Sequence, residues 1–324
     1  MNVDSFILHP FDNLRSGPSA FILYLANGTH LAICAGDEAA ASVVNFLART
    51  AQLSPAPCPL PSGVRRLLVG NAVDRNDIST NVSGTDIVYP LEPTDTLQPS
   101  RRRLHPFALP EPLTSEQWHC QQLVRLSACI AHQAQPGGVL LHSGLALLPS
   151  PNGRGQRYRT PLGDEGGILL AGRSGVGKST ATRRLPWPWR SLADDATLVV
   201  RDAAGAYWAH PWPTWSRFFG KEKGDGRDTW DVQQAVPLRA IFILEQGEED
   251  QVEPLGPGHA VALLTELAQQ TATHFLHGLP LDEIAAFNRL RFENICSLVR
   301  SVPAYTLHVS LEGAFWDVIA HVMR

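Results

Sequence analysis

The sequence predicts an α/β protein in which a domain with a mixed sheet follows a smaller α/β domain. Short apolar runs alternate with segments of helical periodicity through the C-terminal part of the chain, as in sheets covered by helices. A proline-rich stretch precedes that part, and 324 residues exceed the usual size of one domain. We therefore expect a small domain over residues 1–110 and a larger one over 111–324.

The first domain is predicted from a hairpin, a helix and a strand. Two apolar runs, 20–25 and 30–34, flank the turn dipeptide Asn27-Gly28. Asp37 can cap a helix whose apolar residues recur from Ala40 to Ala51, and a strand is expected at 67–69. No catalytic constellation is visible there. The domain could recognise an acceptor, mediate homo-oligomerisation or brace its neighbour, and its residues leave these roles open.

Six prolines between positions 90 and 112 predict an extended linker, and the second domain begins after it. Thr114 and Gln117 have the spacing of a capping box at the start of a helix. Further helices are expected directly after residue 177 and at 257–268, 282–299 and 313–323. Strands are predicted at 139–141, 145–148, 168–171, 197–200, 240–244 and 305–309.

Composition excludes several classes of protein. A hydrophobic fraction of 44% and a net charge of −4 are typical of a soluble globular protein without the basic stripe of a nucleic-acid binder. The five cysteines form no C-x-x-C pair, so neither a disulfide framework nor a zinc ribbon is indicated. The cysteines favour a reducing cytoplasm, and the charge gives no sign of a nucleic-acid partner. No apolar run is long enough to cross a bilayer, so we also expect no membrane partner.

A phosphate-binding loop is the most specific motif of the chain. It matches G-x-x-x-x-G-K-[ST], follows an apolar strand and opens a helix. Its glycines let main-chain N–H groups converge on phosphate oxygens, Lys178 supplies a cation, and the hydroxyl of Ser179 suits Mg²⁺. We therefore expect ATP with Mg²⁺ to bind the residues Gly172, Arg173, Ser174, Gly175, Val176, Gly177, Lys178, Ser179 and Thr180.

Two adjacent aspartates, Asp194 and Asp195, precede the apolar run 197–200. In an extended segment their side chains project in opposite directions, so one can face a metal and the other an acceptor hydroxyl. Phosphoryl transfer needs both roles, because a metal neutralises developing charge while a base or orienting carboxylate aligns the nucleophile. A turn with two solvated aspartates is the alternative, which the apolar flank and the nearby loop disfavour.

Three short motifs together resemble the catalytic core of HPr kinase/phosphorylase and its relatives, and within these the SynChlorMet-cassette branch. They are Leu141-His142-Ser143-Gly144, the run from Ala171 to Thr180, and Leu192-Ala193-Asp194-Asp195; the resemblance covers about residues 115 to 255. It implies a P-loop kinase fold related to ATP-dependent phosphoenolpyruvate carboxykinase. It also implies catalytic roles for Lys178 and for His142 as the active-site histidine, with Asp194 as general base and Asp195 beside the metal, although the order of the aspartates stays open.

The chain also departs from that family. Thr180 stands where the regulatory enzyme has an acidic residue, and neither the C-terminal glycine-rich signature nor the docking segment for HPr is found. The acceptor is therefore expected to be something other than HPr. An insertion at 149–166 carries Arg154, Arg157 and Arg159, which could reach an anionic acceptor or lie in an exposed hairpin.

A segment downstream, 210–219, combines aromatic rings with His210 and Arg217. Two prolines stiffen it, so it could line an acceptor pocket in which Arg217 holds a carboxylate or phosphate. An aromatic core segment is the equal alternative. The polar, glycine-rich stretch 220–228 is either a lid or a plain surface loop.

These features predict an ATP- and Mg²⁺-dependent kinase that transfers a γ-phosphoryl group to a hydroxyl of a small metabolite, a peptide or a protein. A nucleotide-dependent switch or ATPase is the alternative, but its segments, such as LSGGQ or N-K-x-D, are not found in the sequence. A non-catalytic ATP-binding scaffold of a biosynthetic cluster and a carboxykinase-like lyase are two further alternatives.

Overall fold

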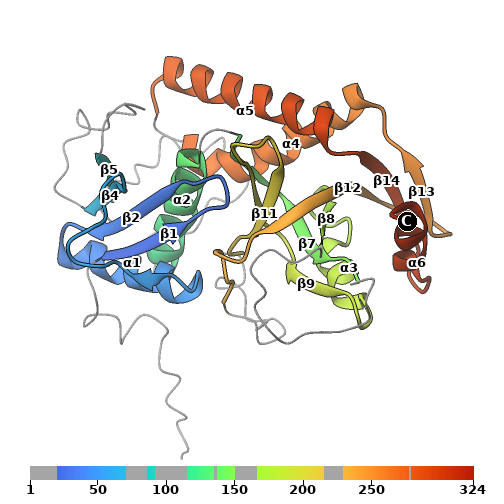
Figure 1. Cartoon of the computed structure of the whole chain (residues 1–324), viewed down its shortest axis with the longest axis horizontal. Coiled ribbons are helices and arrows are strands. Elements are labelled where there is room, and N and C mark those ends of the chain that lie inside the picture. Colours follow the sequence, from blue (N-terminus) through green and yellow to red (C-terminus); the bar gives the residue numbers. More distant parts are fainter. Residues whose placement is uncertain are drawn as a thin grey trace, which may run out of the picture. The chain divides into compact units, whose positions relative to one another are not determined.

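Figure 1 shows the computed structural model of the chain, which describes residues 20–70, 86–91, 115–134, 137–149, 166–214, 229–276 and 279–324. The described part is a mixed α/β structure with two mixed sheets and six helices. It divides into two compact units, the first built mainly from the chain before Leu126 and the second mainly from the chain after it. The predicted linker and the boundary at residue 110 lie almost wholly outside the described residues.

The first unit is built on a five-stranded sheet of order β3-β1-β2-β4-β5. β1 and β2 form the predicted hairpin, and Gly28 in its turn has a φ of 83° that glycine adopts without strain. β4 and β5 continue the sheet in parallel, which makes it mixed. The strands are β1 Ala20–Tyr24, β2 His30–Ala35, β3 Ser54–Pro55, β4 Arg65–Gly70 and β5 Asp86–Pro90.

Helix α1, Glu38–Thr50, packs on this sheet and confirms the prediction of a capped helix. The carboxylate of Asp37 accepts a hydrogen bond of 2.8 Å from the Ala40 N–H, which satisfies one of the free donors at the helix start. Its buried face includes Val43, Val44 and Leu47, at the spacing that one side of a helix requires.

Helix α2, Ser115–Gln133, confirms the helix predicted after residue 114. Within the first unit its His119 Nε2 lies 3.0 Å from the Ser42 hydroxyl of α1. Thr114 of the expected capping box lies outside the described residues.

The second unit contains a nine-stranded sheet whose main path is β6-β10-β11-β12-β8-β7-β9, with β14 and β13 joined to it beside β12. β12 pairs in parallel with both β8 and β14 and antiparallel with β11, so the sheet is mixed. The strands are β6 Val139–Leu141, β7 Ser143–Leu147, β8 Gly167–Ala171, β9 Arg190–Ala193, β10 Thr197–Arg201, β11 Tyr207–Pro211, β12 Val236–Gln246, β13 Gln251–Pro254 and β14 Ala304–Val309.

The central strands of this sheet are buried and alternate their side chains between two faces. One face forms a core in which Leu170 and Phe242 pack with Ala181 of α3 and with Phe315 and Ile319 of α6. The long helices α4 and α5 contact each other and β6 (Figure 1). The helices of this part are α3 Lys178–Arg184, α4 Pro257–Leu276, α5 Leu281–Ser301 and α6 Phe315–Val322.

The strands and helices predicted for the second domain are confirmed, with shifted ends. β3, β5, β9, β11 and β13 were not predicted. They have five residues or fewer, and their identity as strands depends on pairing: β11 pairs with the neighbouring β10, and the others pair with segments further away in the chain. In the described part of the chain, no helix combines the length and apolarity needed to cross a bilayer.

We expect the substitution Gly144→Ala to destabilise the second unit by about 1–3 kcal/mol, because overpacking has this cost. A Cβ at position 144 would lie 2.6 Å from Thr182 Cγ2 and 3.2 Å from the Ala193 carbonyl oxygen. Gly258→Ala in α4 is the matched control, since its Cβ would meet no atom within 4 Å. The control variant should keep the wild-type free energy of unfolding or gain up to about 1 kcal/mol. Urea unfolding of both variants checks this, and equal stabilities would contradict it.

Candidate functional site

The phosphate-binding loop lies between β8 and α3, the context that the motif requires. β8 ends at Ala171 and α3 begins at Lys178. Gly175 and Gly177 have φ values of 82° and 108°, which side chains with a Cβ rarely adopt. At Gly172 a Cβ would lie 2.8 Å from Val176 Cγ1, so the loop closes tightly there as well. The glycines therefore set the curvature of the loop.

Lys178 is the buried cation of the loop, with a residue exposure of 4%. Its Nζ donates hydrogen bonds to the carbonyl oxygens of Gly172 at 2.9 Å and Arg173 at 3.0 Å. It also lies 3.7 Å from Asp195 Oδ1. Burial lowers the pKa of Lys178, and the charge of Asp195 opposes that shift. The ammonium group is thus held at the loop with a carboxylate as its counter-charge.

His142 and Asp195 meet beside the loop. His142 stands between β6 and β7, and its Nε2 lies 2.8 Å from Asp195 Oδ1. Its Nδ1 lies 2.6 Å from Gln270 Oε1 of α4. The ring is therefore fixed at both nitrogens, and Asp195 Oδ1 is shared between an imidazole and an ammonium group. Two residues from separate segments, His142 and Lys178, therefore converge on the Asp195 carboxylate.

Asp194 occupies a different environment from its neighbour. Its residue exposure is 8%, and the Thr214 hydroxyl donates to its Oδ1 over 3.4 Å. Thr214 lies shortly after the end of β11, within the segment 210–219 that the sequence suggests for acceptor binding. The two carboxylates contact different partners, although they stand in a bend between β9 and β10 and not in the extended segment that the prediction assumed. One meets the loop lysine and His142, and the other meets Thr214.

Helix α4 supplies two polar residues that sequence reasoning missed, Glu266 and Gln270. Glu266 Oε2 accepts a hydrogen bond of 2.9 Å from Arg173 Nη2, and this bond raises the pKa of Arg173. Gln270 contacts His142 as described above. Their spacing of four residues places both on one face of the helix, a signal that the sequence does contain.

A pocket of about 570 Å³ opens between the loop, the end of β12 and α4. It is bordered by main chain at the glycines and by apolar side chains of Ile243, Leu263 and Leu267. Ser174 lines this pocket and is exposed, and Thr180 on α3 is exposed as well. Ser179 is half-buried, and its carbonyl oxygen accepts a hydrogen bond of 3.1 Å from the Thr182 hydroxyl. An apolar wall next to a loop of N–H donors suits a ligand that combines a flat ring with an anionic chain.

His210 is buried completely, and main-chain groups contact both of its ring nitrogens. Nε2 accepts from the Ala26 N–H at 3.2 Å, and Nδ1 donates to the Val232 carbonyl oxygen at 2.7 Å. Burial lowers the pKa of His210 from 6.5 to about 4, against the raising effect of the bond to Val232. Arg217, the stretch 220–228 and the insertion arginines lie outside the described residues.

We expect His210 to make stability depend on pH. This histidine takes up a proton near pH 6.5 in the unfolded chain but only near pH 4 in the folded chain. Its full contribution to stability is therefore present above pH 6.5 and is lost as the pH falls from 6.5 toward 4. The loss from this residue should reach about 3 kcal/mol. Across this pH range, the free energy of unfolding measured with urea should change less with pH in His210→Gln than in the wild-type protein. The control His259→Gln, at an exposed histidine, should keep the wild-type slope; identical slopes in all three proteins would refute the prediction.

Comparison with known proteins identifies one family. Residues 159–324 match the family model of the SynChlorMet cassette protein ScmC. That match includes the phosphate-binding loop, both aspartates and all of α4, and it spans more than half of the chain. No curated protein matches the chain. The resemblance to the cassette branch is thereby confirmed, and the chain belongs to the SynChlorMet cassette protein ScmC family.

Proposed function

We propose that this protein is an ATP- and Mg²⁺-dependent kinase that phosphorylates a hydroxyl of a small metabolite, a peptide or a protein. The observation that carries the proposal is the meeting of Lys178, His142 and Asp195 at the phosphate-binding loop, with Asp194 beside them. We further propose that the second unit has a P-loop kinase fold of the HPr kinase type. The strand that ends in the loop and the position of His142 between β6 and β7 support this.

The loop and α4 form the nucleotide side of the proposed site. The residues fit ATP, because the glycines leave room for phosphate oxygens at the N–H groups and Lys178 brings a positive charge. Bound ATP with Mg²⁺ would supply the phosphoryl group and neutralise part of its charge. Ser179 and Asp195 would hold the metal. Two protein ligands are enough, since Mg²⁺ in such sites keeps waters and phosphate oxygens as its other ligands.

Asp194 and His142 define the acceptor side. In the proposal, Asp194 accepts the proton of the acceptor hydroxyl at its carboxylate, as a general base does. Its hydrogen bond to Thr214 is long, at 3.4 Å, so it can be exchanged for one to the acceptor. His142 positions Asp195 through its Nε2 and keeps that carboxylate close to Lys178. This division keeps the order of the two aspartates that the family resemblance implies.

Transfer to an acceptor tests the function directly. The purified protein, incubated with Mg²⁺, γ-labelled ATP and fractions of a cell extract, should place label on an acceptor in one fraction. Purified HPr should remain unlabelled, because Thr180 and the missing docking segment argue against it. Hydrolysis of bound ATP with no labelled acceptor in any fraction would instead favour the nucleotide-dependent ATPase.

We expect Asp194→Asn and Asp195→Asn to have different effects. Asp194→Asn should leave ATP affinity within about threefold of wild type but reduce transfer by about 10²–10⁴-fold, the usual contribution of a general base. Asp195→Asn should also weaken ATP binding in the presence of Mg²⁺, because it loses the counter-charge of Lys178 and a metal ligand. Isothermal titration with a non-hydrolysable ATP analogue, together with the transfer assay, measures both effects.

The control for these variants is Asp282→Asn, which makes the same change at an exposed position of α5. It should keep wild-type affinity and transfer. If the effects of the two site variants are exchanged, Asp195 is the base and Asp194 the metal ligand. If neither variant changes transfer, the kinase proposal fails.

A further inference from the structure

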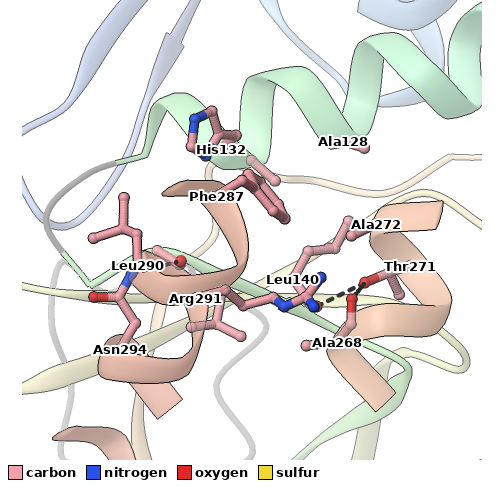
Figure 2. Close-up of a pocket in the computed structure, with 13 residues that line it drawn as sticks. Ala128, His132, Leu140, Ala268, Thr271, Ala272, Phe287, Leu290, Arg291 and Asn294 are labelled. Carbon is pink, nitrogen blue, oxygen red and sulfur yellow. Dashed lines mark hydrogen bonds between the residues drawn. The ribbon is translucent and has the colours of Figure 1, made fainter. Parts of the chain in front are cut away.

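A second pocket lies in the second unit, away from the phosphate-binding loop. Figure 2 shows it between α4, α5, β6 and the end of α2, and its volume is about 30 Å³. That is room for one or two water-sized groups. Most of its wall is apolar and closely packed, with Ala128, Ala272 and Leu290 among the lining residues.

Arg291 of α5 brings a positive charge to this pocket (Figure 2). The residue is 9% exposed, and its guanidinium carbon lies 5.3 Å from the centre of the Phe287 ring. Its Nη2 donates to the side-chain oxygens of Gln269 and Asn288. Both of these partners are neutral, so the pocket contains a buried cation that they do not neutralise.

The rest of the guanidinium group has no hydrogen-bond partner in the part of the chain that the structure describes. Nε and Nη1 are buried, and within the described residues neither has a hydrogen-bond partner. No carboxylate of the described chain forms an ion pair with Arg291. Burial accordingly lowers the pKa of Arg291. A buried arginine normally has a carboxylate or another anion beside it, because an uncompensated charge in the interior is strongly destabilising.

The neighbouring polar groups do not fill this role. The Thr271 hydroxyl makes hydrogen bonds to the carbonyl oxygens of Leu140 and Ala268. The Asn294 amide donates to the Gly138 carbonyl oxygen at 3.2 Å. These bonds fix the wall of the pocket and leave the positive charge of Arg291 facing it.

We propose that this pocket binds one small monovalent anion, either a halide ion or a single carboxylate group, on the guanidinium of Arg291. The charge of Arg291 selects an anion, and the small volume excludes a nucleotide or a sugar phosphate. The site contains none of the residues assigned to ATP or to the acceptor. The proposed anion site therefore does not depend on the proposed kinase function.

A crystal of the wild-type protein soaked in bromide tests the position of the site. Bromide scatters anomalously, so a peak within hydrogen-bonding distance of the Arg291 guanidinium is the expected result. A parallel soak in formate shows whether a carboxylate takes the same place. Water alone on the guanidinium in both soaks, or no density there, would overturn the proposal.

Thermal unfolding tests the same site in solution. At constant ionic strength, replacing gluconate by chloride, bromide or formate should raise the wild-type Tm by about 2 °C or more for the anion that binds, because a ligand of the folded state stabilises it. Arg291→Gln should abolish the rise. Arg300→Gln, which removes one exposed charge from the same helix, should keep it.

An unchanged anion dependence in Arg291→Gln would contradict the proposal, as would a wild-type Tm that does not respond to any of the three anions. If Arg291→Gln does not fold, the bromide and formate soaks of the wild-type protein decide the matter. Because none of these measurements involves ATP, their failure is distinct from a failure of the proposed kinase activity.

Discussion

The parallel pairing of β12 with β8 is the constraint on which the geometry of the site depends. It aligns Ile243 with Ala171, the last residue of β8, so the phosphate-binding loop begins beside β12. β12 continues for three residues past that point, pairing with β14. The loop therefore begins next to a part of β12 that is still paired with β14 at its other edge. A parallel pair buried on both faces gives such an anchor, because neither strand can shift without exposing apolar surface.

The buried charges of the site follow from this placement. Once the loop is fixed, Lys178 is carried into the protein with an exposure of 4%, where an isolated ammonium group would be costly. Two carbonyl oxygens and Asp195 compensate that cost. Asp195 is available because β9 pairs with β7 and ends at Ala193, directly before the two aspartates. Sheet topology thus brings the cation and its counter-charge together from segments that are separate in sequence.

The sequence predicted the parts of the site that local chemistry determines. The loop motif depends on short-range rules and stands between a strand and a helix as predicted, and outside the site the cap at Asp37 follows the same kind of rule. The different partners of Asp194 and Asp195 arise in a bend, where strand alternation does not apply. The contacts of Glu266 and Gln270 could not be predicted in the same way. They lie on α4 and reach Arg173 and His142 over 93 and 128 positions, so only the packing of that helix beside the loop pairs them.

His210 is a second residue whose role could not be predicted from local sequence. A histidine in an aromatic, proline-rich segment suits a binding pocket as well as it suits a core, and residue types alone do not separate the two. The register of β11 with β10 places Leu198 opposite His210, and the ring lies in the interior, bonded to main chain at both nitrogens. Strand register, which is set by pairing across the sheet, decides which side chains are buried.

The hydrogen bonds of His142 explain why the two aspartates can differ in role. Gln270 Oε1 faces Nδ1 and Asp195 Oδ1 faces Nε2, so both ring nitrogens donate when the amide lies this way. Reversing the Gln270 amide would present an N–H to Nδ1 and suit a neutral ring that still donates from Nε2. In either state Asp195 accepts from Nε2, which holds that carboxylate in a fixed position beside Lys178. Asp194 accepts from the Thr214 hydroxyl over 3.4 Å, so in the proposed mechanism the acceptor hydroxyl replaces Thr214 at that carboxylate.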